Sequence, residues 1–284
     1  MTRAGRVTPV RVRRMRAERT VEEDDVLATE EPMEIRVVSL EDGQEASRSL
    51  SVTMRTPGDD FELAVGFLFG EGLLRSRRDV DRVVYCETPI AEQEYNVVSV
   101  VLRDGATIDS HRLERHFYTT SSCGVCGKTS LDAVRVQAAY DIPRDRPRVR
   151  REVVAGLPDR LGGGQEVFRE TGGLHAAGLF DANGRLEALR EDVGRHNAVD
   201  KVVGHRVLSG RVPLSDQILT VSGRASFEIL QKAAVAGIPF VVAVGAPSNL
   251  ALDLAKEFGM TLVGFARGDA FNVYTGGHRI VERP

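Results

Sequence analysis

Two β-prone runs open the regular part of the chain. Residues 34–40 and 49–54 are rich in Val, Ile, Leu and Thr, and Asp42 and Gly43 lie between them. An Asp-Gly pair between two such runs is a strong short-range signal for a tight turn. The pattern therefore predicts a β-hairpin.

A helix and a second hairpin follow. Apolar residues recur at helical spacing over residues 61–68, and the aspartates at 59–60 are placed to cap the first turn of this helix. The run 96–102 and the run 106–109 flank another Asp-Gly turn. We expect a small α+β unit up to about residue 115.

The C-terminal half alternates between strand-like and helix-like patterns. Strands are predicted at 176–180, 185–189, 218–221, 239–244, 261–265 and 271–274, and helices within 192–208, 226–236 and 250–258. The run 239–244 is apolar throughout, as in a strand buried on both faces. Alternation over short connections predicts an α/β fold, a sheet with helices on both faces in three layers.

Pro, Gly and charge divide the chain. Residues 141–152 are rich in proline and charge and are predicted to be a linker, while glycines at 162–164 and 172–173 predict loops. The predicted parts are a basic flexible leader over 1–28, an N-terminal α+β unit over 29–150, and a C-terminal α/β domain over 151–284.

Composition narrows the class of protein. The chain has 284 residues, is 42% hydrophobic and carries a net charge of −3, which disfavours a nucleic-acid binder or a disordered chain. Three cysteines do not make a disulfide scaffold and fit a reducing compartment. No run is long and apolar enough to span a membrane. Acidic residues, not an apolar segment, follow Arg13 and Arg14, so we expect a cytoplasmic protein without an export signal.

Cys123 and Cys126 form a C-x-x-C motif in a glycine-rich loop, just before a predicted helix that starts near Thr129. The positive end of the helix and the charge of Lys128 favour the reactive thiolate. The motif fits a sulfur carrier, a dithiol redox pair or half of a zinc site. Polar, glycine-rich flanks argue against two buried, unreactive cysteines. Cys86 is expected to pack as a small apolar residue.

The zinc and redox alternatives lack parts of their usual patterns. A zinc deaminase has H-x-E before P-C-x-x-C, whereas His111 and Glu114 are spaced H-x-x-E and Ser122 replaces the proline. His116 or His175 remains a possible ligand. A thioredoxin-like pair is expected near the start of a βαβ unit, and this motif follows a hairpin instead.

Three turns that follow predicted C-terminal strands carry the second candidate site. They span residues 222–226, 245–248 and 267–269. Ligands of open α/β sheets bind at the carboxyl ends of the strands, and helix N-termini there bind phosphate. Arg224 and Arg267 can each pair with phosphate through two hydrogen bonds. This edge is predicted to take a phosphorylated ligand, and ordinary turns with surface arginines are the alternative.

Residues 190–201 form a third candidate, because they gather many ionisable groups before a helix. His196 could bond a ligand or a partner chain. A capped helix start with a satisfied histidine is the preferred interpretation.

Several longer motifs occur together in one order. They are RTPGDD (55–60), YTTSSCGVCGK (118–128), TGGLHA (171–176), EDVGRHNAVDK (191–201), SGRASFE (222–228), GFARG (264–268) and NVY (272–274). Through them the chain, from about residue 32 onward, resembles the formate dehydrogenase accessory sulfurtransferases of the FdhD/NarQ family.

The resemblance implies a sulfurtransferase. Sulfur from a cysteine desulfurase would form a persulfide on Cys123, with Cys126 assisting transfer or shielding the sulfur. The acceptor would be the molybdenum (or tungsten) bis(molybdopterin guanine dinucleotide) cofactor of formate dehydrogenase, a bound substrate and not a permanent cofactor. The implied cofactor-binding residues are Phe265, Ala266, Arg267, Gly268, Asp269 and Ala270.

The resemblance also implies a cytidine-deaminase-like, three-layer α/β/α fold, a homodimer, and no metal ligands of the protein's own. Two rival functions stay open. One is a cofactor-binding chaperone without sulfur transfer, and the other is a zinc-dependent, deaminase-like enzyme.

Overall fold

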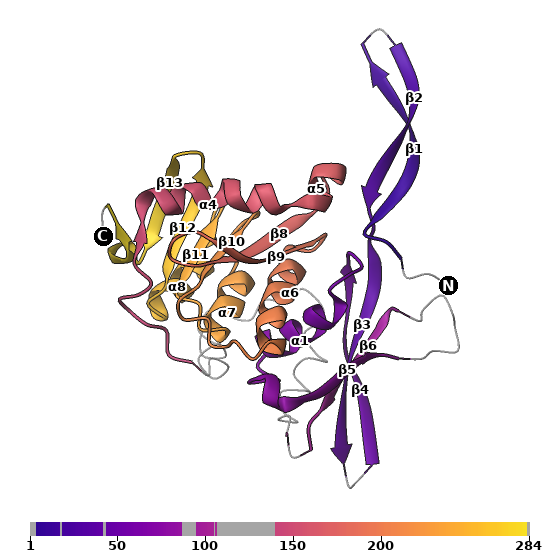
Figure 1. Cartoon of the computed structure of the whole chain (residues 1–284), viewed down its shortest axis with the longest axis horizontal. Coiled ribbons are helices and arrows are strands. Elements are labelled where there is room, and N and C mark those ends of the chain that lie inside the picture. Colours follow the sequence, from indigo (N-terminus) through magenta and orange to yellow (C-terminus); the bar gives the residue numbers. More distant parts are fainter. Residues whose placement is uncertain are drawn as a thin grey trace.

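The computed structural model describes residues 4–17, 19–41, 44–86, 95–104, 106 and 140–282. Its two larger sheets have four and six strands, and helices lie between them (Figure 1). The smaller sheet belongs to the N-terminal part of the chain and the larger sheet to the C-terminal part.

The four-stranded sheet has the order β4-β3-β6-β5. Its strands are β3 (Glu31–Glu41), β4 (Gln44–Arg55), β5 (Val80–Tyr85) and β6 (Val97–Leu102), and the short helix η1 (Arg77–Asp79) leads into β5. The hairpin of β3 and β4 confirms the first prediction.

The second predicted hairpin is wrong. Strand β6 is buried along its whole length and pairs with β3 on one side and β5 on the other. A fully buried central strand needs partners on both sides, and long-range pairing supplies them in place of the local turn. Residues 107–109, the predicted partner strand, lie outside the described residues.

Helix α1 (Asp60–Gly70) confirms the predicted helix and packs its apolar side chains into the core. The predicted aspartate cap does not form. Asp59 has a left-handed φ of 55° and makes no side-chain capping bond. Asp60 instead accepts hydrogen bonds from the Gly58 amide at 3.2 Å and from Arg55 Nε at 3.0 Å.

The six-stranded sheet has the order β13-β12-β11-β10-β8-β9. Its strands are β8 (His175–Phe180), β9 (Leu186–Asp192), β10 (Ile218–Val221), β11 (Phe240–Ala243), β12 (Thr261–Arg267) and β13 (Ala270–Thr275). Strands β10, β11 and β12 are parallel, and the other pairings are antiparallel. All six were predicted.

Helices cover both faces of this sheet. One face carries α6 (Arg195–Leu208), α7 (Phe227–Val235) and α8 (Asn249–Glu257), and the other carries α4 (Arg151–Gly164) (Figure 1). Successive strand residues point to opposite faces of the sheet. Leu219 packs in the cluster of α6 and α7, and Ile218 packs with α4. The three-layer α/β prediction is confirmed, and the likeness to cytidine deaminase stays a prediction.

The predicted loop at 162–164 is wrong, because these glycines form the last turn of α4. The apolar face of Val153, Val154, Leu157 and Leu161 buries the helix on the sheet, and this burial outweighs the low helix propensity of glycine. A short helix, α5 (Glu166–Thr171), follows. Strand β7 (Val149–Arg150), from the end of the predicted linker, pairs with β14 (Ile280–Val281) after η3 (Gly277–Arg279).

The segment predicted as a flexible leader instead forms two antiparallel strands, β1 (Val7–Arg16) and β2 (Arg19–Ala28). This ribbon extends away from the two sheets (Figure 1), and β2 contacts α5. The charged runs that suggested a solvated tail face each other: Arg13 lies opposite Glu22, and Arg14 Nε is 2.7 Å from Glu23. Opposite charges across strands favour such a pairing.

The N-terminal unit is held to the C-terminal unit by a close crossing of α1 and α6. A Cβ on Gly66 would lie 1.8 Å from the Asp200 carbonyl oxygen, and one on Gly204 would lie 1.9 Å from the Glu62 carbonyl oxygen. The two glycines therefore let the helix backbones touch. Within the described residues, no helix combines the length and apolar character that a membrane crossing requires.

Candidate functional site

The first predicted site, Cys123 and Cys126 with the neighbouring Lys128, lies outside the described residues, as does the helix predicted after it. Cys86, the remaining cysteine, is half-buried just after β5. Its Sγ is 2.8 Å from Ser99 Oγ on β6, so its thiol has a polar partner.

Two of the three predicted turns, 222–226 and 245–248, meet at one edge of the six-stranded sheet, and β12 joins them through Phe265 and not through the predicted turn at 267–269. The Gly245 amide donates to the Gly223 carbonyl oxygen at 2.9 Å, and the Phe265 amide donates to the Gly245 carbonyl oxygen at 3.1 Å. A bridge between Ala225 and Pro247 joins the first two turns further. These bonds tie the carboxyl ends of β10, β11 and β12 into a continuous ledge, residues 222–226, 245–248 and 264–268.

Glycines make this close approach possible. A Cβ on Gly245 would lie 3.0 Å from the Gly223 carbonyl oxygen and 3.0 Å from Arg224 Cγ. One on Gly264 would lie 2.9 Å from Pro247 Cδ. The ledge is consequently a rigid backbone surface, which is the form that anion-binding turns take in open α/β sheets.

The predicted segment 265–270 divides between surface and core. Phe265 has a left-handed φ of 52° and a side chain that is 51% exposed, while Ala266 is buried in the core on the α4 side. Residues 267–270 are exposed and form the turn into β13. A non-glycine residue at positive φ is uncommon and points to a functional constraint. It holds an exposed aromatic ring on the ledge.

A groove of about 630 Å³ continues from this turn along β13. Its lining includes Arg151, Asp269, Ala270, Phe271 and Val273. The last two residues of the predicted segment therefore face this groove.

Strand β8 and helix α6 bring further side chains to the same ledge. Because β8 runs antiparallel to β10, its first residue, His175, lies beside the end of β10. There the Ser222 hydroxyl oxygen accepts a hydrogen bond from the Ala176 amide at 2.9 Å. Helix α6 begins at Arg195, and His196 Nε2 lies 3.1 Å from Ser226 Oγ.

Both histidines are uncharged near neutral pH. Burial lowers the pKa of His196 to about 4, and the positive charge of Arg195 adds to this effect, while Glu228 opposes it. Burial also lowers the pKa of His175, and Arg195 acts in the same direction against Asp192. A neutral imidazole carries one N–H donor and one acceptor nitrogen. The bond to Ser226 agrees with the interpretation of His196 as a satisfied histidine.

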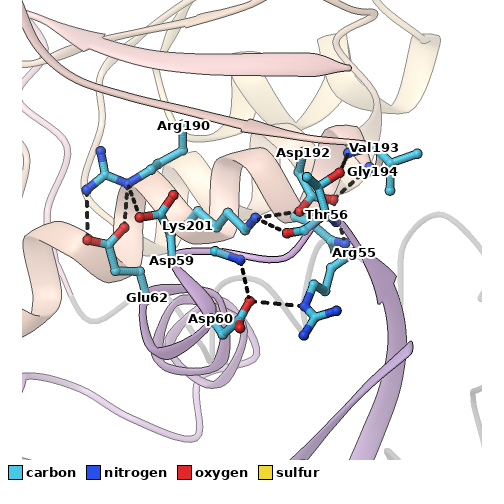
Figure 2. Close-up of polar contacts among 12 residues, drawn as sticks. Arg55, Thr56, Asp59, Asp60, Glu62, Arg190, Asp192, Val193, Gly194 and Lys201 are labelled. Carbon is cyan, nitrogen blue, oxygen red and sulfur yellow. Dashed lines mark hydrogen bonds and ion pairs between the residues drawn. The ribbon is translucent and has the colours of Figure 1, made fainter. Parts of the chain in front are cut away.

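The third predicted constellation separates into two parts. Arg195 and His196 lie at the ledge, whereas Asp192 and Lys201 lie in a buried junction with Thr56 (Figure 2). Lys201 Nζ is 2.7 Å from Asp192 Oδ2 and donates to the Thr56 carbonyl oxygen at 2.9 Å. The Thr56 amide donates to the same carboxylate at 3.2 Å.

A second ion pair stands beside this junction. Arg190 donates from Nε and Nη2 to the Glu62 carboxylate at 2.5 and 2.7 Å, and its Nε is 3.6 Å from Asp59 (Figure 2). The motif at 55–60 thus meets the motif at 191–201. The contacts of these residues hold the two units together, and sequence reasoning had not paired the two motifs.

Within the described residues, no three His, Cys, Asp or Glu side chains gather as a metal site. The zinc alternative requires Cys123 and Cys126, which are outside those residues, so it stays a prediction. Arg195 was not singled out from the sequence. Its position directly before His196 in a motif was the signal that could have found it.

The fold and the ledge define an α/β protein whose open sheet has a glycine-rich edge. A sequence model of the FdhD/NarQ family matches residues 28–281. The chain belongs to this family. It is 53% identical over 283 residues to the sulfur carrier protein FdhD of Streptomyces coelicolor, with 98% of both chains covered. It is 48% identical over 280 residues to the FdhD protein of Nocardia farcinica, with 98% of this chain and 96% of the relative covered.

A solved structure agrees over the whole fold. The crystal structure of a candidate formate dehydrogenase accessory protein from Desulfotalea psychrophila superposes with a TM-score of 0.72 at 26% identity. The match covers 97% of this chain and 99% of the other. The resemblance inferred from the motifs is therefore confirmed at the level of family and fold.

Proposed function

We propose that this protein is a sulfur carrier in the maturation of formate dehydrogenase. The observation that carries the proposal is the near-complete match to relatives named sulfur carrier proteins, at up to 53% identity over 98% of the chain. The C-x-x-C motif of Cys123 and Cys126 supplies a fitting nucleophile.

In the proposed loading step, the Cys123 thiolate attacks the outer sulfur of a persulfide on a cysteine desulfurase. A new S–S bond forms on Cys123 as the S–S bond of the desulfurase breaks, and the desulfurase cysteine leaves as a thiolate. This exchange needs no external oxidant or reductant. Lys128 and the helix start predicted after it would favour the thiolate, and Cys126 would assist transfer or shield the bound sulfur.

The proposed acceptor is the molybdenum (or tungsten) bis(molybdopterin guanine dinucleotide) cofactor, bound as a substrate at the ledge. The exposed Phe265 ring offers a face on which a guanine base can stack. Arg224 is exposed in the turn after β10, Arg267 is exposed at the turn between β12 and β13, and each can pair with phosphate oxygens. The rigid backbone of the turns positions these groups without a large ordering cost.

Intact-mass spectrometry tests sulfur loading directly. The protein is incubated with a cysteine desulfurase and cysteine, and the mass is compared before and after reduction. We expect a reducible gain of one sulfur atom that is absent in Cys123→Ala and retained in Cys86→Ala, the matched control. Equal loading of wild type and Cys123→Ala would refute the assignment.

The ledge also supports a second candidate, a cofactor-binding chaperone without sulfur transfer. This function uses Phe265 and the turns but not Cys123. A reduced, folded protein that binds guanosine diphosphate and takes up no sulfur would favour the chaperone over the carrier. Stoichiometric zinc after purification would instead favour the zinc-dependent alternative.

A further inference from the structure

We propose that Arg195 and His175 bind a phosphate group of the ligand, at the end of the ledge opposite Phe265. The inference deepens the proposed function and rests on it only for the identity of the ligand, a guanine dinucleotide. It assigns the base to the Phe265 end and the diphosphate to the end formed by β8, the 222–226 turn and the start of α6.

The first observation is an open space beside Gly223, bordered by His175 and Arg195 and here called the cradle. A Cβ built on Gly223 would lie 3.5 Å from His175 Nδ1 and 3.9 Å from Arg195 Cδ. A donor-bearing ring and an arginine side chain therefore both border the side-chain space that this glycine leaves empty. Glycine is the residue used where a ligand must approach the backbone closely.

The second observation concerns the guanidinium of Arg195. Its Nε is buried and, within the described residues, has no hydrogen-bond partner. A buried donor without a partner costs free energy, and a charged donor costs more. A phosphate oxygen at the cradle would supply the missing acceptor and the opposite charge.

The local charge favours an anion. Arg195 and Arg224 are both cationic, and no acidic side chain described in the structure forms an ion pair with either. Nearby, Glu228 is 57% exposed and lies 3.7 Å from His196, and Asp192 is fully buried against Lys201. The Glu228 carboxylate is hydrogen-bonded to Ser226, while Asp192 is paired with Lys201, so both nearby carboxylates are already engaged.

The geometry of the sheet sets the span of the site. Phe265, Gly245, Gly223 and His175 lie on four successive strand positions, in the order β12, β11, β10 and β8. Three spacings between neighbouring strands amount to roughly 14 Å. A ledge of this length accommodates a base at one end and a diphosphate at the other. Phe265 and the cradle can therefore act on one nucleotide.

Isothermal titration of the full chain with guanosine diphosphate, guanosine and pyrophosphate tests the assignment. We expect Arg195→Gln and His175→Gln to weaken guanosine diphosphate binding, by about 10-fold for the arginine, because a charge-assisted hydrogen bond is lost. Guanosine binding should stay unchanged. Gly223→Ala should also weaken the binding of guanosine diphosphate, since its methyl group would occupy part of the cradle at ordinary contact distances.

Arg185→Gln is the matched control, because Arg185 is 75% exposed in the turn between β8 and β9, at the far end of β8 from the cradle. Circular dichroism verifies the fold of each variant. If Arg195→Gln does not fold, the smaller Gly223→Ala substitution still tests the site. Unchanged guanosine diphosphate affinity in folded variants would overturn the inference, as would a wild type that binds no guanosine diphosphate. Phosphate binding that depends on Arg195, together with failed sulfur loading, would overturn the carrier function alone.

Discussion

At the residue scale, the positions most sensitive to substitution are the buried charged residues between the two units. Lys201 and Asp192 are both fully buried, and the lysine ammonium group is held by a carboxylate and a carbonyl oxygen. Two charges taken out of water lose hydration, and only close pairing and hydrogen bonds offset that loss. These residues therefore tolerate little change, although they are not positioned to contact a ligand at the ledge.

We predict that Lys201→Met lowers the free energy of unfolding by about 3–5 kcal/mol, because Asp192 would remain buried without a counter-charge. Urea denaturation followed by far-UV circular dichroism measures the change. Arg82→Ala removes an exposed pair with Glu45, whose side chains are 54% and 61% exposed, and should cost less than about 1 kcal/mol. Equal effects of the two substitutions would contradict the assigned role of the buried pair.

At the scale of elements, the crossing of α1 and α6 decides how the two units dock. The helices approach so closely at Gly66 and Gly204 that backbone atoms of one helix occupy the side-chain space of the other. This contact brings the Thr56 loop onto Asp192, and it places the start of α6 beside the ledge. The site thus depends on two glycines far from it.

Gly204→Ala should destabilise the protein by about 3 kcal/mol, because the added methyl group would force the helices apart. Gly162→Ala in α4 is the matched control, since no atom lies within 4 Å of its Cβ position. Alanine there should stabilise the protein by about 0.5–1 kcal/mol through its better helix propensity. Thermal unfolding measures the melting temperature of both variants. A higher melting temperature than wild type in both would contradict the close contact of the helices at Gly204.

At the scale of the whole molecule, the two sheets share one hydrophobic core. A single cluster of buried residues contains Val98 of the smaller sheet, Leu68 of α1, Val203 of α6 and Leu219 of the larger sheet. The interface between the units is consequently interior and not a contact between independent surfaces.

We therefore expect one cooperative unfolding transition, although a chain of 284 residues is long enough to unfold in steps. Differential scanning calorimetry should give equal calorimetric and van't Hoff enthalpies. Removal of residues 1–28 should leave this transition in place, because the β1–β2 ribbon lies outside the shared core. Two separate transitions in the full chain would show that the units unfold independently.

Local sequence patterns predicted most of the helices and strands. They failed where a segment is stabilised by residues that are distant along the chain. All six strands of the larger sheet were predicted: β10 and β11 are short apolar runs that end at turns, and the Asn183-Gly184 turn marks the hairpin of β8 and β9. The failure at 162–164 has a different cause, since burial of Leu157 and Leu161 sustains a helix that glycines would otherwise end. The leader was mispredicted because its charges were considered one strand at a time.

The candidate site shows the same division. The turns at 222–226 and 245–248 were predicted to share an edge, since a parallel β-α-β order fixes which ends meet. His175 and Arg195 were not predicted to meet at Gly223, because their meeting depends on the antiparallel placement of β8 and on the docking of α6. No local signal specifies those two arrangements.

The sequence by itself determined the family, the presence of the C-x-x-C motif and the alternation of strands and helices, because these are properties of neighbouring residues. The tertiary structure decided which motifs meet. It joined residues 55–60 to 191–201 as a buried junction, and it set Phe265, Gly223 and Arg195 along one ledge. Such contacts join residues that are distant along the chain, and only the packing of complete elements brings them within bonding distance.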